Sequence, residues 1–311
     1  DFDLNVKNSN LYALNLIKDY PGALLSFSGK TNMIGNSLDN INGFILFDNI
    51  LFTNQGKTLN VNEIKFVSRI IDNNTNFLIN SDFVNGSFTG NFKYSTVSNT
   101  INKIVKYYLP ALAVTTNINE KTQNHIDIDL KIDNTDEISN VLDLPYKLSG
   151  TSTIKGFIDE KSNRINIAAN IPSIKTSKQS IDNLTFNFEN QQQQLKLTTR
   201  AQIPDKKEST RIYLIASAAK DSITSQLGWQ NSSKITNAGE IQTITKLWTE
   251  NGKMAARMNI MPTQVIISDS VWDIRPSKID LNTDSTIQIH NFRFENKNQY
   301  VHIDGKASKS Q

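Results

Sequence analysis

The stretch "HIDIDLKID" (His125 to Asp133) decides the fold class, because apolar and polar residues alternate through it without a break. Successive side chains of a strand point to opposite faces, so the isoleucines and Leu130 fall on one face and the aspartates and Lys131 on the other. The same alternation recurs in "RINIAANI" (164–171), "TIQIHNFRF" (286–294), "YVHIDGKAS" (300–308) and the initial "FDLNV". It predicts a mainly β protein: a long, twisted antiparallel sheet with one dry face and one wet face.

Composition sets limits on what such a sheet can do. The chain has 311 residues, of which 38% are hydrophobic, and a mean hydropathy of -0.40. These values favour a high surface-to-core ratio over a packed globule. A net charge of +3 from scattered residues gives no nucleic-acid footprint. The absence of cysteine excludes disulfides, thiolate catalysis and zinc–cysteine sites, and leaves the redox compartment open.

The ends of the sequence indicate an interior piece of a longer protein. The chain opens in strand pattern with "DFDLNV", without an initiator Met or a signal-like segment. No stretch approaches the roughly 20 apolar residues that a membrane span needs. We therefore expect one elongated β section covering 1–311, with approximate sub-units 1–113, 114–220 and 221–311.

Few segments have helical spacing. The clearest runs from Ser98 to Ala113, where Pro110 should end or kink the helix. Its apolar stripe consists of Ile101, Ile104, Val105, Tyr108, Leu109 and Leu112. We expect this helix to lie against the dry face or to close one end of a groove. Further short helices are expected at Asn134 to Pro145 and at Gly239 to Trp248.

A weak internal repeat shifts the apolar pattern by one residue. "IDNLTFNFENQQQQLKL" (181–197) resembles "IHNFRFENKNQYVHI" (289–303), with an echo at "INGFILFDNILF" (41–52). In each, an Ile is followed three residues later by a large apolar residue, at Phe44, Leu184 and Phe292. Such a step fits a β-bulge or corner within a strand. It fits equally well a strand that starts afresh after a turn.

Catalytic motifs are absent from the sequence. "SGKT" (28–31) has Leu24 where a P-loop needs its first Gly. Asp127 and Asp129 share a strand face with Lys131, which is typical of a solvated surface and not of a glycosidase pair. His290 and His302 flank one turn but have no Asp, Glu or Cys that completes a metal set, and we expect exposed cross-strand residues. We predict that the protein is not an enzyme and binds no cofactor and no metal.

Several longer segments resemble the TamB/AsmA-like proteins of Bacteroidetes. They are "MPTQVIISDSVWDIRPSKIDL" (261–281) with the strand pair that follows it, "NFLINSDFVNGSFTGNFKYSTVSNTINKIVKYYLPAL" (76–112) and "DEISNVLDLPYKLSGTSTIKGFI" (136–158). The residues that fit the family pattern are Val265, Ile267, Asp269, Trp272, Ile274, Pro276 and Gly305.

The resemblance implies a periplasm-spanning protein of a Gram-negative cell envelope, anchored in the inner membrane, whose sheet curls into a U-shaped groove. Such a groove carries phospholipid toward the outer membrane, and relatives support outer-membrane protein assembly with a BamA-like barrel partner. The family's anchor helix and its C-terminal barrel-contacting domain are not visible here, so we expect an interior section of the groove.

The alternating pattern also indicates lipid binding, independently of the resemblance. A sheet with one dry face and few covering helices must place that face against something, and acyl chains fit it. The groove-lining residues we predict are Phe186, Phe188, Ile212, Leu214, Ile287, Ile289, Phe292, Phe294, Val301 and Ile303. The alternatives are a structural or adhesive extracellular β-protein with a closed core, and a carbohydrate-processing β-enzyme, which the lack of an acidic cluster near aromatics disfavours.

Overall fold

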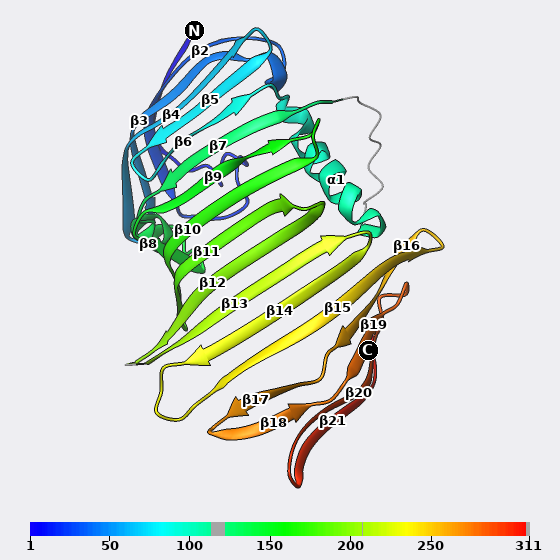
Figure 1. Ribbon diagram of the computed structural model, residues 1–311. Coiled ribbons are helices and arrows are strands. Elements are labelled where there is room, and N and C mark those ends of the chain that lie inside the picture. The colour runs from blue at the N-terminus through cyan, green and yellow to red at the C-terminus, as the bar shows by residue number, and fades with distance from the viewer. Residues whose placement is uncertain (113–121, 207, 309–311) are drawn as a thin grey trace. The chain divides into compact units, whose positions relative to one another are not determined.

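The computed structural model describes residues 1–112, 122–206 and 208–308. Of these residues, 66% lie in strands and 9% in helices, and the strands form a long antiparallel sheet of 21 strands (Figure 1). The predicted mainly β fold with short helices is confirmed. None of the helices in these ranges has the length and apolarity to cross a membrane.

Residue contacts divide the chain into two compact units, and each is described by itself. Unit 1 comprises residues 1–100, 121–162 and 167–180, and unit 2 comprises residues 101–120, 163–166 and 181–311. The three sub-units expected from the sequence stay a prediction, and the boundary at 113/114 lies outside the described residues.

Unit 1 is a meander of antiparallel strands. β1 pairs with β2, and pairing continues in chain order to β7, which pairs with β9; β8 pairs with β10. The strands are β1 (Phe2–Ser9), β2 (Leu24–Ile34), β3 (Asn42–Asn54), β4 (Lys57–Ile71), β5 (Asn74–Ser81), β6 (Val84–Gly90), β7 (His125–Ile132), β8 (Tyr146–Ser149), β9 (Ser152–Asp159) and β10 (Arg164–Thr176). Short 3-10 turns η1 (Leu38–Asn40) and η2 (Tyr94–Thr96) and helix α2 (Asp136–Val141) interrupt them.

Unit 2 continues the same antiparallel pattern. Pairing runs in chain order from β11 to β16, then to β19, β20 and β21, while β17 and β18 form a hairpin that pairs with β15 and β20. The strands are β11 (Ser180–Gln191), β12 (Gln194–Asp205), β13 (Glu208–Ala219), β14 (Ser222–Asn231), β15 (Ala238–Glu250), β16 (Lys253–Ile260), β17 (Thr263–Ile267), β18 (Ser270–Ile274), β19 (Ser277–Leu281), β20 (Ile287–Asn296) and β21 (Gln299–Ala307).

Asparagines in the left-handed conformation mark the places where the strand register shifts. At each one, two residues of its strand oppose a single residue of the neighbouring strand, which defines a β-bulge. These asparagines are Asn8 in β1 (φ 48), Asn49 in β3 (φ 53), Asn183 in β11 (φ 52) and Asn291 in β20 (φ 48). Asn tolerates this backbone region better than other residues with a side chain, so the residue type suits the geometry.

The three repeat segments differ in whether their apolar step is a β-bulge or the start of a new strand. The bulge interpretation is confirmed between Ile181 and Leu184 and between Ile289 and Phe292. After Ile41 the alternative is confirmed instead, because η1 ends just before it and β3 begins at Asn42.

The alternation predicts the burial of β7 correctly. Ile126 is buried and the other apolar residues of this strand are half-buried, whereas its aspartates and Lys131 are exposed. Elsewhere in unit 1, Leu59 and Val61 of β4 form a small core with Val141 of α2. The core of unit 1 therefore includes a cluster that lies between sheet and helix.

Helix α1 (Val97–Tyr108) confirms the helix expected at Ser98 to Ala113, and its α-helical turns end before Pro110, which begins the 3-10 turn η3 (Pro110–Leu112). The predicted end at Ala113 lies outside the described residues. The buried residues are Thr100, Ile104, Tyr108 and Leu109. Ile101 and Leu112 are 42% and 37% exposed, so the stripe is narrower than expected.

Within unit 2, the C-terminal part of α1 binds residues at strand ends. The amide of Asp221, in the β13–β14 turn, donates to the carbonyl of Tyr108 over 3.2 Å. The carboxylate of Asp221 accepts from the amide of Ala111 over 2.7 Å, and Asn190 near the end of β11 donates to the Tyr108 hydroxyl. The helix runs along these strand ends (Figure 1) instead of lying flat on the dry face. Closure of a groove end by α1 stays a prediction.

The remaining helix expectations have opposite outcomes. The helix expected at Asn134 to Pro145 is confirmed as α2. The helix expected at Gly239 to Trp248 is wrong, because these residues belong to β15 and pair with β14 and β16. Ile and Thr recur there on alternate positions, and β-branched residues favour strands.

The bulge at Asn183 gives a stability prediction. Replacing Asn183 by Val should destabilise the protein by about 1–2 kcal/mol, because a β-branched residue is strained at φ 52. Asn183→Gly should change stability by less than about 0.5 kcal/mol. Urea unfolding measures both variants, with Asn187→Val in the same strand as control. Equal effects of Val at positions 183 and 187 would contradict the assignment.

Helix α1 gives a second stability prediction, which compares alanine substitutions at a buried and an exposed isoleucine. Ile104 is 1% exposed and Ile101 is 42% exposed. Ile104→Ala should cost about 2–4 kcal/mol of unfolding free energy and Ile101→Ala less than about 1 kcal/mol. Chemical denaturation of both variants tests the orientation of the helix. A larger loss at position 101 would show that the helix is rotated.

Candidate binding face

The strand register of unit 2 places all of the predicted lining residues on one face. Directly paired residues of neighbouring strands share a face. One continuous row of such pairs runs through Phe186, Thr199, Leu214, Leu227 and Ile241. The other predicted residues join this face by the same rule or by the period of two along their strands: Phe188, Ile212, Ile287, Ile289, Phe292, Phe294, Val301 and Ile303.

The bulge in β20 allows the apolar residues on both sides of it to share one face. Ile289 and Phe292 are three residues apart, which in a regular strand would place them on opposite faces. Because His290 and Asn291 together oppose Asp304, Ile289 pairs with Gly305 and Phe292 pairs with Ile303. The bulge therefore keeps the apolar face continuous across the hairpin.

Solvent reaches this face. None of the predicted lining residues is fully buried, and Ile287, Val301 and Ile303 are 44%, 49% and 44% exposed. Further members that the sequence reasoning missed are Leu184, Leu195, Leu197, Leu227, Trp229, Ile241, Met258 and Ile279. The alternation in "QLKL" (194–197) would have found two of them.

Unit 1 carries a second apolar face, which the sequence reasoning did not single out. Phe77 lies between the rings of Phe66 and Phe88, each with a centroid distance of 6.2 Å. Phe27 of β2 meets Phe47 of β3 edge to face at 5.4 Å. All of these rings are half-buried, so neighbouring strands present adjoining aromatic side chains that solvent still reaches.

The segment that carries the family resemblance forms a structural unit in unit 2. Pro262 and Pro276 lie just outside the β17–β18 hairpin. Within it, Val265 and Ile274 are 2% and 4% exposed and form a buried cluster with Ile260. Trp272 stacks on Phe294 of β20 with a ring separation of 4.7 Å and an interplanar angle of 17°. These residues belong to the apolar face, which packs upon itself here.

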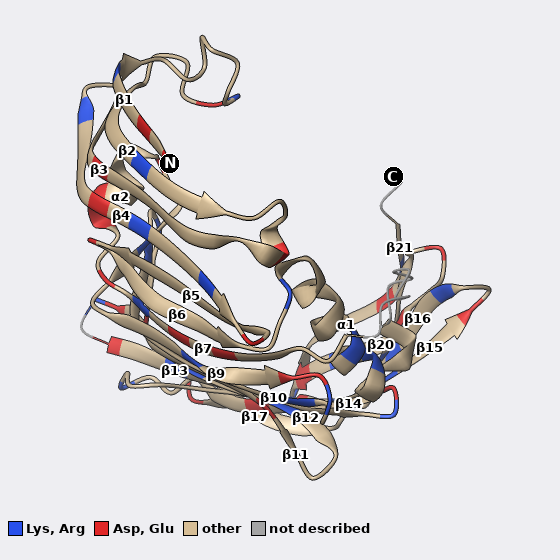
Figure 2. Cartoon of the chain, turned by 90° about the horizontal axis from the view of Figure 1, so that it is seen from above, with Lys and Arg blue, Asp and Glu red and all other residues tan. Residues whose placement is uncertain are grey.

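In both units, the sheet face opposite the apolar face carries charged side chains. In unit 1, Lys155 pairs with Asp129 over 2.9 Å, and both side chains are more than half exposed. Basic and acidic residues are interspersed along the strands (Figure 2). The expected solvated face at Asp127, Asp129 and Lys131 is confirmed by the exposure of all of them.

Other candidate sites show no catalytic geometry. Residues 28–31 lie within β2 and pair with β1 and β3, so their backbone cannot form a phosphate loop. His302 is exposed and lies opposite Arg293, whereas His290 is half-buried and is not its cross-strand partner. Among the described residues, no group of three or more His, Asp or Glu side chains is placed to hold a metal ion.

A tyrosine and a glutamate interact across the polar face of unit 2. The ring of Tyr213 lies over Gly228, where an added Cβ would meet the ring at 2.3 Å. Its hydroxyl donates to Glu240 over 2.5 Å. This hydrogen bond raises the pKa of Tyr213 and lowers the pKa of Glu240. The pair therefore keeps the phenol protonated and the carboxylate ionised.

Asp280 of β19 organises the polar face at the C-terminal end of unit 2. Its carboxylate accepts from Arg257 Nε over 2.7 Å and from Arg257 Nη2 over 2.9 Å. His290 Nε2 lies 3.1 Å from the same carboxylate. The hydrogen bonds from Arg257 hold the pKa of Asp280 below its ordinary value, and His290 acts in the same direction. Asp280 is therefore a fixed negative charge.

Comparison with known proteins gives no relative. No family model, curated protein or solved structure matches the chain. Candidate roles therefore rest on the sequence patterns and on the geometry of the two faces.

The lowered pKa of Asp280 predicts a pH dependence of stability. A depressed pKa in the folded state stabilises the protein above the ordinary value of about 4, and this contribution disappears as pH falls through the folded-state pKa. Asp280→Asn should cost about 1 kcal/mol at pH 7 and progressively less below pH 4. Urea unfolding across this range measures it, with the exposed Asp129→Asn as control. A pH-independent difference would contradict the account.

Proposed function

We propose that this chain is a non-enzymatic section of a lipid conduit whose apolar faces hold phospholipid acyl chains. The observation that carries the proposal is the continuous apolar face of unit 2, which solvent reaches along its predicted lining residues. Acyl chains match such a surface because they need no hydrogen bonds and each buried methylene contributes about 0.8 kcal/mol.

The alternation of the strands supports a conduit for an amphipathic ligand. Acyl chains would lie along the apolar faces of both units, while polar head groups would stay in water. In this proposal the faces curl into a U-shaped groove with a hydrophobic interior. In general, contiguous exposed apolar strips larger than a few hundred Å2 mark binding surfaces or aggregation sites.

The resemblance to TamB/AsmA-like proteins extends the proposal to a cellular setting. On that basis the full-length protein would be anchored in the inner membrane of a Gram-negative bacterium and cross the periplasm. This section would move phospholipid between the inner and outer membranes, or support outer-membrane protein assembly, with a BamA-like barrel partner reached through the rest of the chain.

The exposure of the apolar residues favours the conduit over a structural or adhesive protein with a closed core. In a closed core, residues in the middle of the dry face would be buried on all sides. Leu227, in the middle strands of unit 2, is 41% exposed. Fully buried apolar residues of strands β11 to β21 lie around the β17–β18 hairpin, near strand ends at Leu195 and Ala218, and at the small Ala255 and Ala256 of β16.

A matched pair of charge substitutions on β14 tests the proposal. Leu227 points to the apolar face and Thr224, three residues earlier, points to the polar face. Leu227→Arg should lose most of the phospholipid that co-purifies with the wild-type protein, and Thr224→Arg should retain it. Leu227 is a better probe than Phe294, because Phe294 stacks on Trp272 and its loss would also disturb packing.

Native mass spectrometry measures the bound phospholipid, and thermal melting verifies the fold. We expect Leu227→Arg to melt within a few degrees of the wild type, because the new charge reaches water. If Leu227→Arg unfolds at ambient temperature while Thr224→Arg does not, the face is sealed and the closed-core alternative holds. A folded wild-type protein without any bound phospholipid would also contradict the conduit.

A further inference from the structure

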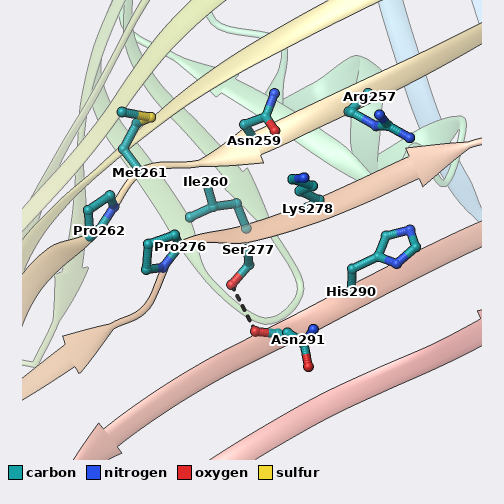
Figure 3. Close-up of a pocket in the computed structure, with 10 residues that line it drawn as sticks. All are labelled: Arg257, Asn259, Ile260, Met261, Pro262, Pro276, Ser277, Lys278, His290 and Asn291. Carbon is teal, nitrogen blue, oxygen red and sulfur yellow. Dashed lines mark hydrogen bonds between the residues drawn. The ribbon is translucent and has the colours of Figure 1, made fainter.

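We infer that the polar face of unit 2 carries a binding site for a phosphate group, in a hollow of about 630 Å3 beside the break between β16 and β17. Figure 3 shows Arg257, Lys278 and His290 along one side of this hollow, with Met261, Pro262 and Pro276 at the break. This site lies on the face opposite the apolar strip, so it is independent of the proposed lipid function.

Three neighbouring strands bring the basic residues together. Asn259 of β16 pairs with Lys278 of β19, and Lys278 pairs with His290 of β20. Arg257 lies two residues before Asn259 and therefore points to the same face. Strand pairing thus fixes the spacing of these side chains, and the prolines at the break interrupt the ladder beside them.

The hollow has an excess of positive charge. Lys246 of β15 pairs directly with Arg257, which adds another cation next to the hollow. Two carboxylates face this group: Asp280, which Arg257 and His290 both bind, and Asp304, which accepts from the backbone amide of Asn291 over 3.0 Å. Within the described ranges, neither Lys278 nor Lys246 has a carboxylate at ion-pair distance. Three permanent cations therefore face two anions, which leaves one excess positive charge at the hollow.

The free donors suit a phosphate oxygen cluster. The Arg257 guanidinium has more N–H groups than the two that bind Asp280. Lys278 supplies a further ammonium, whereas His290 donates its Nε2–H to Asp280 and offers a second donor only when its ring is protonated. By holding Arg257, Asp280 preorganises the remaining guanidinium N–H donors, which would otherwise lose side-chain entropy on binding. Arg and Lys together are the usual partners of phosphate oxygens.

Titration with inorganic phosphate, followed by calorimetry and backbone amide NMR shifts, tests the site. We expect saturable binding by the wild-type protein, with shifts centred on β16, β19 and β20. Lys278→Gln should weaken binding about five-fold or more, which corresponds to about 1 kcal/mol. Lys278 is exposed, so this change should leave the fold intact. Lys155→Gln, which removes an exposed lysine from unit 1, should bind like the wild type.

Two further ligands identify the source of the phosphate. Glycerol phosphate should compete with inorganic phosphate if the site takes soluble esters, and phosphatidylglycerol vesicles should compete if it takes a lipid head group. Competition by either one supports the assignment. The inference is overturned if the wild-type protein shows no saturation by about 10 mM phosphate, or if Lys278→Gln binds as tightly as the wild type. Equal loss in Lys155→Gln would show non-specific attraction and would also overturn it.

Discussion

Cross-strand pairing forces neighbouring side chains onto a common face, and every other feature of this sheet depends on that constraint. If the alternating pattern shifts by one residue, the apolar side chains that follow point toward the solvent-facing side of the sheet. Bulges at Asn49, Asn183 and Asn291 correct such steps without a break in the sheet. Each bulge costs a left-handed backbone conformation, which Asn accepts at low strain. The apolar face thereby continues from strand to strand.

The two faces divide the chemistry of unit 2. The apolar face packs upon itself around the β17–β18 hairpin, where Val265 and Ile274 are buried, whereas Leu227, Val301 and Ile303 on the same face stay exposed. On the other face, Asp280 gathers Arg257 and His290 into an ordered basic group. Strands β12 to β15 are each paired on both sides, so their backbone hydrogen bonds are satisfied within the sheet. The sheet leaves one surface suited to acyl chains and the other to water and anions.

Much of this organisation is readable from the sequence. Alternation predicts the strands and the members of the apolar face, because both depend on local period. The bulges at Asn183 and Asn291 were one of two equally weighted interpretations, and the bulge at Asn49 was not predicted, although "FDNILF" (47–52), "IDNLTF" (181–186) and "IHNFRF" (289–294) share Asn between apolar residues. Residues 239–248 were wrongly predicted as a helix because Ile241, Ile244 and Trp248 also fit helical spacing, and pairing with β14 and β16 selects the strand. The hollow beside Pro262 was equally hidden, since Arg257, Lys278 and His290 meet only through strand pairing.

The central claim is that one face of the sheet, and not the other, receives acyl chains. Because the chain has no cysteine, single cysteines along β14 can each carry one environment-sensitive fluorophore. On addition of phosphatidylglycerol micelles, we predict blue-shifted emission at positions 223, 225, 227 and 229, and little change at 224, 226 and 230. This period of two follows from the strand geometry. Equal shifts at odd and even positions, or none at the odd positions, would contradict the account.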